Sequence, residues 1–195
     1  MTLGSSQFVF KSWSVTKTHA LQLLAVVAAI FLSSVFTREC IAAPVLNSMQ
    51  TAEQWEQIAK IRQQIAINHE VQSGNIANGN RSNSLDAGDL LDLAGDEKFL
   101  AAENYHKASQ EWDKAATAYT SAGASQEAKI ARDNMKAASA AAKRALTDGV
   151  YLHMKAKEQY EGTNNLIKQL DALEKAARNL ERLSCGFAQC VNSLF

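Results

Sequence analysis

The pattern of hydrophobic and polar positions divides the chain into two parts. Residues 20–36 (ALQLLAVVAAIFLSSVF) form one largely apolar run of 17 residues, preceded by Lys11 and Lys17 and followed by Cys40-Ile41-Ala42-Ala43-Pro44. Beyond this run, apolar residues recur at intervals of three and four between polar ones, which is the period of an amphipathic helix. The pattern therefore predicts an N-terminal targeting segment followed by an all-α remainder.

The apolar run has the basic flank, apolar middle and small-residue end of a secretory signal peptide. We therefore expect residues 1–43 to be a signal peptide, with cleavage after Ala42 favoured over cleavage after Ala43. An uncleaved N-terminal anchor is the alternative, because about 17 apolar residues are the lower limit for a helix that crosses a bilayer. The protein is thus predicted to be exported, periplasmic or secreted, with membrane contact only through this segment.

The remainder is predicted to hold three regions. Residues 44–72 carry an N-terminal amphipathic helix, centred on residues 50–71, whose apolar stripe includes Trp55. Residues 73–84 read SGNIANGNRSNS and are predicted to form a flexible loop, because Gly, Asn and Ser favour turns. Residues 85–195 are predicted to form a helical bundle domain, or a short stack of antiparallel helices.

The bundle region is predicted to contain several helices separated by glycines. The expected segments are residues 85–94, 96–110, 111–122 and 125–161, and a last helix capped by Thr163. Gly123 stands where a helix C-terminal glycine belongs, and Asp148-Gly149 either divides the long helix or merely weakens it.

The last helix carries apolar residues at alternating intervals of four and three. They are Leu166, Leu170, Leu173, Ala177, Leu180 and, closing the pattern, Ser184. This is a heptad pattern, but it covers fewer than three repeats, and an independent coiled coil needs more. We therefore expect this stripe to pack inside the bundle.

Composition and charge support helices and exclude one class of partner. Proline occurs once, at Pro44, and Ala, Gln, Glu, Lys and Leu are abundant, which favours long helices over sheets. Beyond residue 43 the chain has 17 basic and 19 acidic side chains, a formal charge of −2. No basic face stands out, so nucleic acid is not expected as a partner.

No catalytic or metal-binding signature is found. The histidines at 19, 69, 106 and 153 lack the spacing of a helical metal pair, and no phosphate-binding or nucleophile motif occurs. Asp86, Asp89 and Asp92 recur every third residue and are expected to form a solvated acidic edge rather than a calcium loop. We therefore predict a non-enzymatic protein without metal or cofactor.

Two cysteines remain beyond the signal segment. Cys185 and Cys190 lie close together near the end of the chain, and an exported chain meets oxidants. A local disulfide is therefore the favoured prediction, with Gly186 allowing the helix to break between them. Free or intermolecular thiols are the alternative.

Aromatic and alanine residues share one spacing in the middle of the chain. Trp112, Ala115, Tyr119 and Ala122 follow one another at intervals of three, four and three. This spacing resembles the second helix of a tetratricopeptide repeat, over residues 99–128, although the first helix fits poorly, with Glu103 where a small residue belongs. The resemblance implies an αα-hairpin that binds another polypeptide.

The large aromatics are expected first as core and second as a partner-binding hot spot, since apolar residues at helical spacing bury first. The candidate partner-binding residues are Trp55, Phe99, Tyr105, Trp112 and Tyr119. The function predicted from them is an exported interaction or assembly module that binds another protein or a second copy of itself.

A second interpretation starts from the layout of the chain. An export signal, then Pro44 and the amphipathic helix through Trp55 and Ile65, a loop and long alanine-rich helices are similar to the minor pilus components of type IV secretion systems. This resemblance implies a structural component of a secretion or conjugation apparatus.

Overall fold

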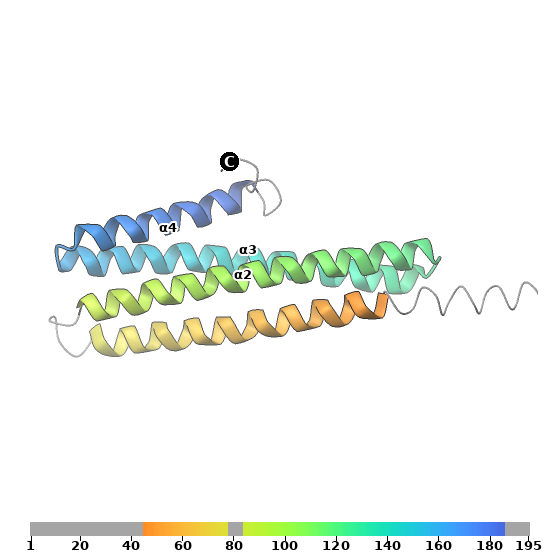
Figure 1. The fold of residues 1–195 in the computed structure, drawn as a ribbon, viewed down its shortest axis with the longest axis horizontal. Helices are drawn as coiled ribbons and strands as arrows, with labels where there is room; N and C mark the ends of the chain where they lie inside the picture. The colour runs from red at the N-terminus through yellow and green to blue at the C-terminus, as the bar shows by residue number, and fades with distance from the viewer. Residues whose placement is uncertain (1–44, 78–83, 186–195) are drawn as a thin grey trace, which may run out of the picture. The chain divides into compact units, whose positions relative to one another are not determined.

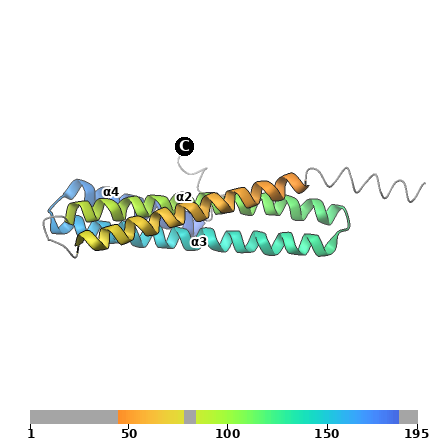
Figure 2. The same cartoon turned by 90° about the horizontal axis from the view of Figure 1, so that it is seen from below.

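The structure is a computed structural model that describes residues 45–77 and 84–185. It contains a first helix, residues 45–77, followed by α2 (Ser84–Ser121), α3 (Ser125–Gly162) and α4 (Leu166–Cys185). No strand occurs in these two ranges, so the predicted all-α bundle is confirmed. The helices lie side by side, and α4 covers the C-terminal half of α3 (Figures 1 and 2).

The first helix is longer than the sequence pattern predicted. Residues 73–77, which were assigned to the flexible loop, are helical. Ser73 is buried, and its hydroxyl donates a hydrogen bond of 2.8 Å to the carbonyl oxygen of Ala87 in α2. This contact fixes the end of the first helix against the start of α2. The rest of the predicted loop, residues 78–83, and the predicted signal peptide, residues 1–43, lie outside the described residues.

α2 is a single helix of 38 residues, so the breaks predicted after residues 94 and 110 are wrong. Residues 96–110 and 111–121, predicted to lie in two helices, therefore belong to one continuous helix. The turn that does exist joins α2 to α3 through Ala122, Gly123 and Ala124. Gly123 has a φ of +73°, as expected of a glycine that ends a helix.

Glycines inside the helices mark close packing rather than helix ends. α3 passes through Asp148-Gly149 without interruption. A Cβ atom on Gly149 would lie 3.1 Å from Nδ2 of Asn179 in α4 and 3.3 Å from the carbonyl oxygen of Gly95 in α2. Gly149 thus lies where three helices approach one another closely. From the sequence alone, a glycine at this position indicates only a weakened helix.

The cap of the last helix also differs from the prediction. Asn165, not Thr163, caps α4, because its Oδ1 accepts a hydrogen bond of 3.2 Å from the backbone N–H of Lys168. The Thr163 hydroxyl instead donates 3.0 Å to the carbonyl oxygen of Tyr160, at the end of α3.

Alanine forms most of the core, and on two helices a series of buried alanines recurs at an interval of seven. These series are Ala52, Ala59 and Ala66 in the first helix and Ala87, Ala94, Ala101, Ala108 and Ala115 in α2. A repeat of seven keeps one stripe facing a neighbouring helix when the pair supercoils to the left. Because alanine is small, the two antiparallel helices approach closely along their length.

Candidate functional site

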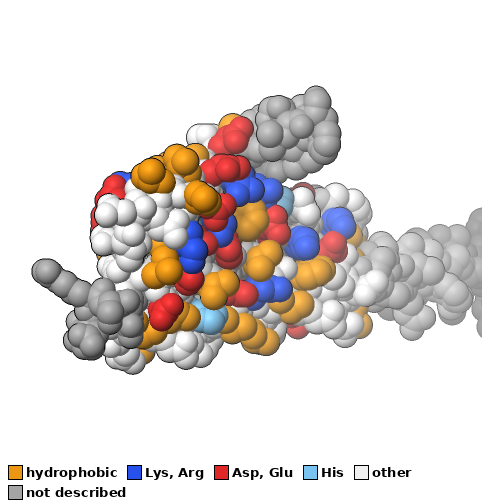
Figure 3. All heavy atoms as spheres, turned by 60° about the vertical axis from the view of Figure 1, so that its left-hand side comes forward, with side chains coloured by type: hydrophobic (Ala, Val, Ile, Leu, Met, Phe, Trp, Pro, Cys, Tyr) orange, Lys and Arg blue, Asp and Glu red, His pale blue; other side chains and the backbone are white. Residues whose placement is uncertain are grey.

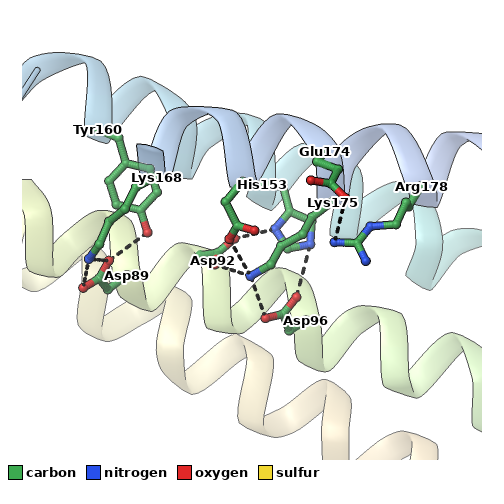
Figure 4. A network of polar contacts seen from close by, with 10 residues as sticks. Asp89, Asp92, Asp96, His153, Tyr160, Lys168, Glu174, Lys175 and Arg178 are labelled. Carbon is green, nitrogen blue, oxygen red and sulfur yellow. Dashed lines mark hydrogen bonds and ion pairs between the residues drawn. The ribbon is translucent and has the colours of Figure 1, made fainter. Parts of the chain in front are cut away.

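The last helix is held against α2 by a row of ion pairs with a constant register. The acidic members on α2 and the basic members on α4 are each seven residues apart: Asp89 with Lys168, Asp96 with Lys175, and Glu103 with Arg182. The N···O distances are 2.6, 3.0 and 2.8 Å in that order. We call this row the charged ladder. Its constant offset makes α4 run parallel to α2, and Figure 4 shows its first two pairs.

A buried histidine lies behind the ladder. The side chain of His153 in α3 is 1% exposed, and its Nδ1 lies 2.8 Å from Oδ1 of Asp92. Asp92 also accepts a hydrogen bond from Nζ of Lys175, so one carboxylate joins all three helices (Figure 4). Seven residues after His153 on α3, the Tyr160 hydroxyl donates a hydrogen bond of 2.8 Å to Oδ1 of Asp89.

The ionisation of these groups is set by their neighbours. Burial alone would raise the pKa of Asp92, but hydrogen bonds from His153 and Lys175 outweigh it and hold that pKa below its ordinary value. Burial opposes the charge of Lys175, whereas hydrogen bonds to Asp92 and Asp96 raise its pKa. Burial and the bond to Asp89 raise the pKa of Tyr160. Asp92 and Lys175 thus carry fixed opposite charges at neutral pH, an arrangement suited to clamping helices rather than to moving protons.

The expectation of a solvated acidic edge is therefore wrong for Asp92, whose side chain is only 15% exposed. Asp89 stays 43% exposed, although it pairs with Lys168 of α4. A signal was present in the sequence, because acidic residues on α2 and basic residues on α4 share the interval of seven. It was missed because each row looks like an ordinary helix surface until its partner is known.

The face that α4 turns toward the bundle carries small side chains and one buried amide. Its buried residues are Ala172, Ala176 and Asn179. The amide nitrogen of Asn179 is buried without a hydrogen-bond partner. Two buried alanines and the partly buried Leu183 contribute a limited apolar area, so the charged ladder supplies much of what orients this helix.

Most of the larger apolar residues of α4 point outward, and Leu183, which packs against the core, is the exception. Their exposed fractions are 69% for Leu166, 82% for Ile167, 67% for Leu170, 37% for Leu173 and 53% for Leu180. We call these residues, together with the exposed Ala177, the leucine face. The expectation that this stripe packs inside the bundle is wrong, because the ladder rotates the opposite side of α4 inward. Figure 3 shows the end of the bundle where α4 begins, with hydrophobic side chains at the surface among charged ones.

Three of the five candidate partner-binding aromatics form a second regular contact, between α2 and the first helix. Tyr105, Trp112 and Tyr119 are seven residues apart, and each donates to an acceptor on the first helix: Gln63 at 3.3 Å, Glu56 at 2.9 Å and the sulfur of Met49 at 3.2 Å. Tyr105 and Trp112 are buried, and Tyr119 is half-buried. Burial and the charge of Glu56 raise the pKa of Tyr105.

The other two aromatics also contact the chain itself. Lys107 lies over the ring of Trp55, with Nζ 4.6 Å from the ring centre. The guanidinium of Arg182, the last member of the charged ladder, lies 4.5 Å from the ring centre of Phe99. These residues therefore build helix–helix contacts, and exposed large apolar residues gather instead on α4 and on the first helix, where Leu46, Ile61 and Val71 are the most exposed.

The structure describes one of the two cysteines of the predicted disulfide. Cys185 is exposed at the end of α4, and Cys190 lies outside the described residues. Among the residues with described positions, no group of three or more His, Cys, Asp or Glu side chains is placed to hold a metal ion.

Gly95 provides a direct test of the close contact at His153. A Cβ atom built there would lie 2.5 Å from Cε1 of the buried ring. We expect Gly95→Ala to lower the free energy of unfolding by about 1–2 kcal/mol, because overpacking outweighs the gain in helix propensity. Gly74→Ala is the matched control, since nothing lies within 4 Å of its added Cβ, and it should stabilise by about 0.5–1 kcal/mol. Urea denaturation of both variants checks the opposite signs.

Two findings complete the description. None of the helices that the structure describes is both long enough and apolar enough to cross a membrane. The sequence matches no protein-family model, and neither the curated proteins nor the solved structures give a match.

Proposed function

We propose that this protein is an exported, non-enzymatic assembly module that binds a helix of another polypeptide on the leucine face of α4. The observation that carries the proposal is the rotation of α4. Ala172 and Ala176 face inward, whereas Leu166, Leu170, Leu173 and Leu180 face outward, although burying those four leucines would remove far more apolar area from water. An amphipathic helix that presents apolar residues at intervals of three and four is the natural ligand for such a surface.

The rest of the molecule supports this role because it holds α4 in a fixed position. The first helix, α2 and α3 are joined along their lengths by buried alanines and regularly spaced hydrogen bonds. The charged ladder then fixes both the direction and the rotation of α4 on that base. A helix presented in a fixed orientation loses little conformational entropy when it binds, which favours affinity.

The proposed binding surface, the leucine face of α4, differs from the aromatic residues that the sequence pattern suggested. The aromatic side chains of α2 are engaged with the first helix, so binding through them would require that contact to open. The leucine face requires no such opening.

Site-specific photocrosslinking in the cells that make the protein tests the proposal. We expect a photoreactive residue at position 170 to give a discrete adduct, whose second polypeptide is identified by mass spectrometry. The matched control is position 130 on α3, where Ile130 is 53% exposed and outside the leucine face. The identified polypeptide, once purified, should bind the wild type and not the variant Leu170→Glu/Leu173→Glu. Equal crosslinking at both positions, or no adduct at position 170, contradicts the proposal.

A further inference from the structure

The first helix carries a long exposed face without a single charged residue. Its positions recur at intervals of three and four along one side of the helix, and every one of them is exposed: residues 47, 50, 54, 57, 58, 61, 64, 65, 68, 71, 72 and 75. Eight of these residues are Asn or Gln, three are Ile and one is Val. We call this surface the amide face. We infer that it binds the amide face of a second copy of this chain, with the two first helices antiparallel and Ile61 at the centre.

The amide face points away from the neighbours of the first helix inside the chain. Ala59 and Ala66 belong to core clusters that include residues of α2 and α3. Ile61 lies about 160° around the helix from Ala59, since a helix has about 3.6 residues per turn. The exposed fractions of Ile58, Ile61 and Ile65 are 39%, 60% and 37%. The first helix and α4 lie at opposite edges of the bundle (Figure 1), so this inference is independent of the proposed function.

The absence of charge is the first argument. A helix face in contact with water normally carries charged side chains, whereas the centres of protein interfaces are depleted of them. The nearest charged residues border the amide face, with Glu53 and Lys60 along one edge and Arg62 along the other. Arg62 is paired with Glu97 at 2.9 Å, and the long stem of Lys60 lets its ammonium group turn toward water. Two amide faces can therefore meet without burying a charge.

The symmetry of the face about Ile61 is the second argument. In an interface formed by a twofold axis, residues at equal distances before and after the centre meet one another. Gln54 and Asn68 each lie seven residues from Ile61, and Ile58 and Ile65 lie three and four residues from it. An antiparallel pair centred on Ile61 therefore sets isoleucine against isoleucine and amide against amide. Each amide offers both donors and an acceptor, so two facing amides can satisfy one another.

The same symmetry indicates the direction of pairing. A parallel pair sets each residue against its own copy, whatever the order of residues along the helix, so it requires no symmetry in the sequence. A parallel pair would also set residues at g positions against the following e positions of the second copy. In this helix that register opposes Glu53 to Ile58 and Lys60 to Ile65. The antiparallel arrangement avoids both of these contacts.

Sedimentation velocity of the full chain in mild detergent, under reducing conditions, tests the inference. We expect the wild type to form dimers at about 100 μM. Ile61→Glu should raise the dimer dissociation constant by more than about 100-fold, because it sets two carboxylates against each other at the twofold axis. Ile130→Glu is the matched control and should change that constant by less than about twofold, since Ile130 is 53% exposed on α3, outside the amide face. Both positions are exposed, so circular dichroism should show unchanged helix content.

A pair of opposite charges tests whether position 61 meets itself. Chains with Ile61→Glu and chains with Ile61→Lys should each remain monomeric, whereas their mixture should form a heterodimer, because unlike charges then meet at the axis. The heterodimer should have a dissociation constant at least about 10-fold below that of either variant alone. A mixture that dimerises no better than its components overturns the inferred contact.

Single cysteines test the direction of pairing under mild oxidation. With the natural cysteines replaced by serine, chains carrying Gln54→Cys should form a disulfide with chains carrying Asn68→Cys, because an antiparallel pair centred on Ile61 brings these two positions together. A parallel pair would instead link each variant to itself. A disulfide within either variant alone, or no disulfide in the mixture, overturns the antiparallel arrangement.

The leucine face provides the comparison that separates this inference from the proposed function. Leu170→Glu/Leu173→Glu should leave the dimer dissociation constant within about twofold of the wild-type value, because it changes α4 and not the first helix. Dimers that are lost in that variant but persist in Ile61→Glu overturn the inference, since the two copies then meet through α4. A wild type that remains monomeric at about 100 μM overturns it as well and leaves the proposed function to its own crosslinking test.

Discussion

Trp112→Ala should lower the free energy of unfolding by about 3–5 kcal/mol, the cost of truncating a buried tryptophan. The side chain is 4% exposed, and its indole N–H donates 2.9 Å to Glu56 on the first helix. Truncation removes a large apolar surface and leaves the Glu56 carboxylate without its donor. A domain of this kind has a total stability of about 5–15 kcal/mol, so the loss is a large part of it. Urea denaturation followed by circular dichroism measures it, since tryptophan fluorescence itself changes with the mutation.

Tyr151→Ala is the matched control for this change. Tyr151 lies on α3 and is 58% exposed, so its truncation should cost no more than about 0.5 kcal/mol. The comparison also decides between the two roles that the sequence suggested for the aromatic stripe. A Trp112→Ala chain that keeps its stability but no longer binds its partner would make Trp112 a binding residue, contrary to the packing described above.

The aromatic stripe illustrates what the sequence could predict. Periodicity identified a helical protein, and the spacing of Trp112 and Tyr119 pointed to burial, which holds for Trp112, while Tyr119 is half-buried. Their partner could not be predicted, because periodicity describes one helix at a time and says nothing of which neighbour lies opposite. The residue types on the first helix gave no hint, since Glu56 and Gln63 look like solvent-facing positions until a donor is placed against them.

Gly95 and Gly149 explain two of the positions at which the sequence suggested a helix break that the structure lacks. Gly95-Asp96 and Asp148-Gly149 were each read as possible breaks, because glycine and aspartate favour turns. In the fold these glycines admit the His153 ring and the backbone of a neighbouring helix, a reason that exists only when three helices are together. At Gly123 the same reasoning succeeded, since the requirement there is a local positive φ.

The rotation of α4 was the least predictable feature. Hydrophobicity alone favoured burial of the leucines, and the charged ladder instead turned them outward. Recognising this from sequence would have required matching two charge rows whose members are 79 residues apart. A non-local electrostatic pattern thus determined which apolar stripe became surface.

Asp92→Ala should lower the free energy of unfolding by about 2–3 kcal/mol, because it leaves two buried donors without their acceptor. One is Nδ1 of His153, in a side chain that is 1% exposed, and the other is Nζ of Lys175, in a side chain that is 20% exposed. Lys175 keeps its bond to Asp96, which limits the loss. Glu174→Ala is the matched control, since Glu174 and its partner Arg178 are 71% and 58% exposed and its removal should cost less than about 1 kcal/mol.

The effect of Asp92→Ala should depend on pH with a definite sign. Because the pKa of Asp92 is lower in the folded protein than its ordinary value of 3.8, its contribution is complete above that value and is lost as the pH falls through the folded-state pKa. The difference in unfolding free energy between wild type and Asp92→Ala should therefore shrink as the pH falls below 3.8 and through the lower folded-state pKa of Asp92. Hydrogen exchange of the α4 amides, measured across the same range, should show this helix opening first, because its apolar contact with the bundle is small. A difference that persists undiminished at about pH 2 would mean that the shape of Asp92, rather than its charge, holds the three helices together.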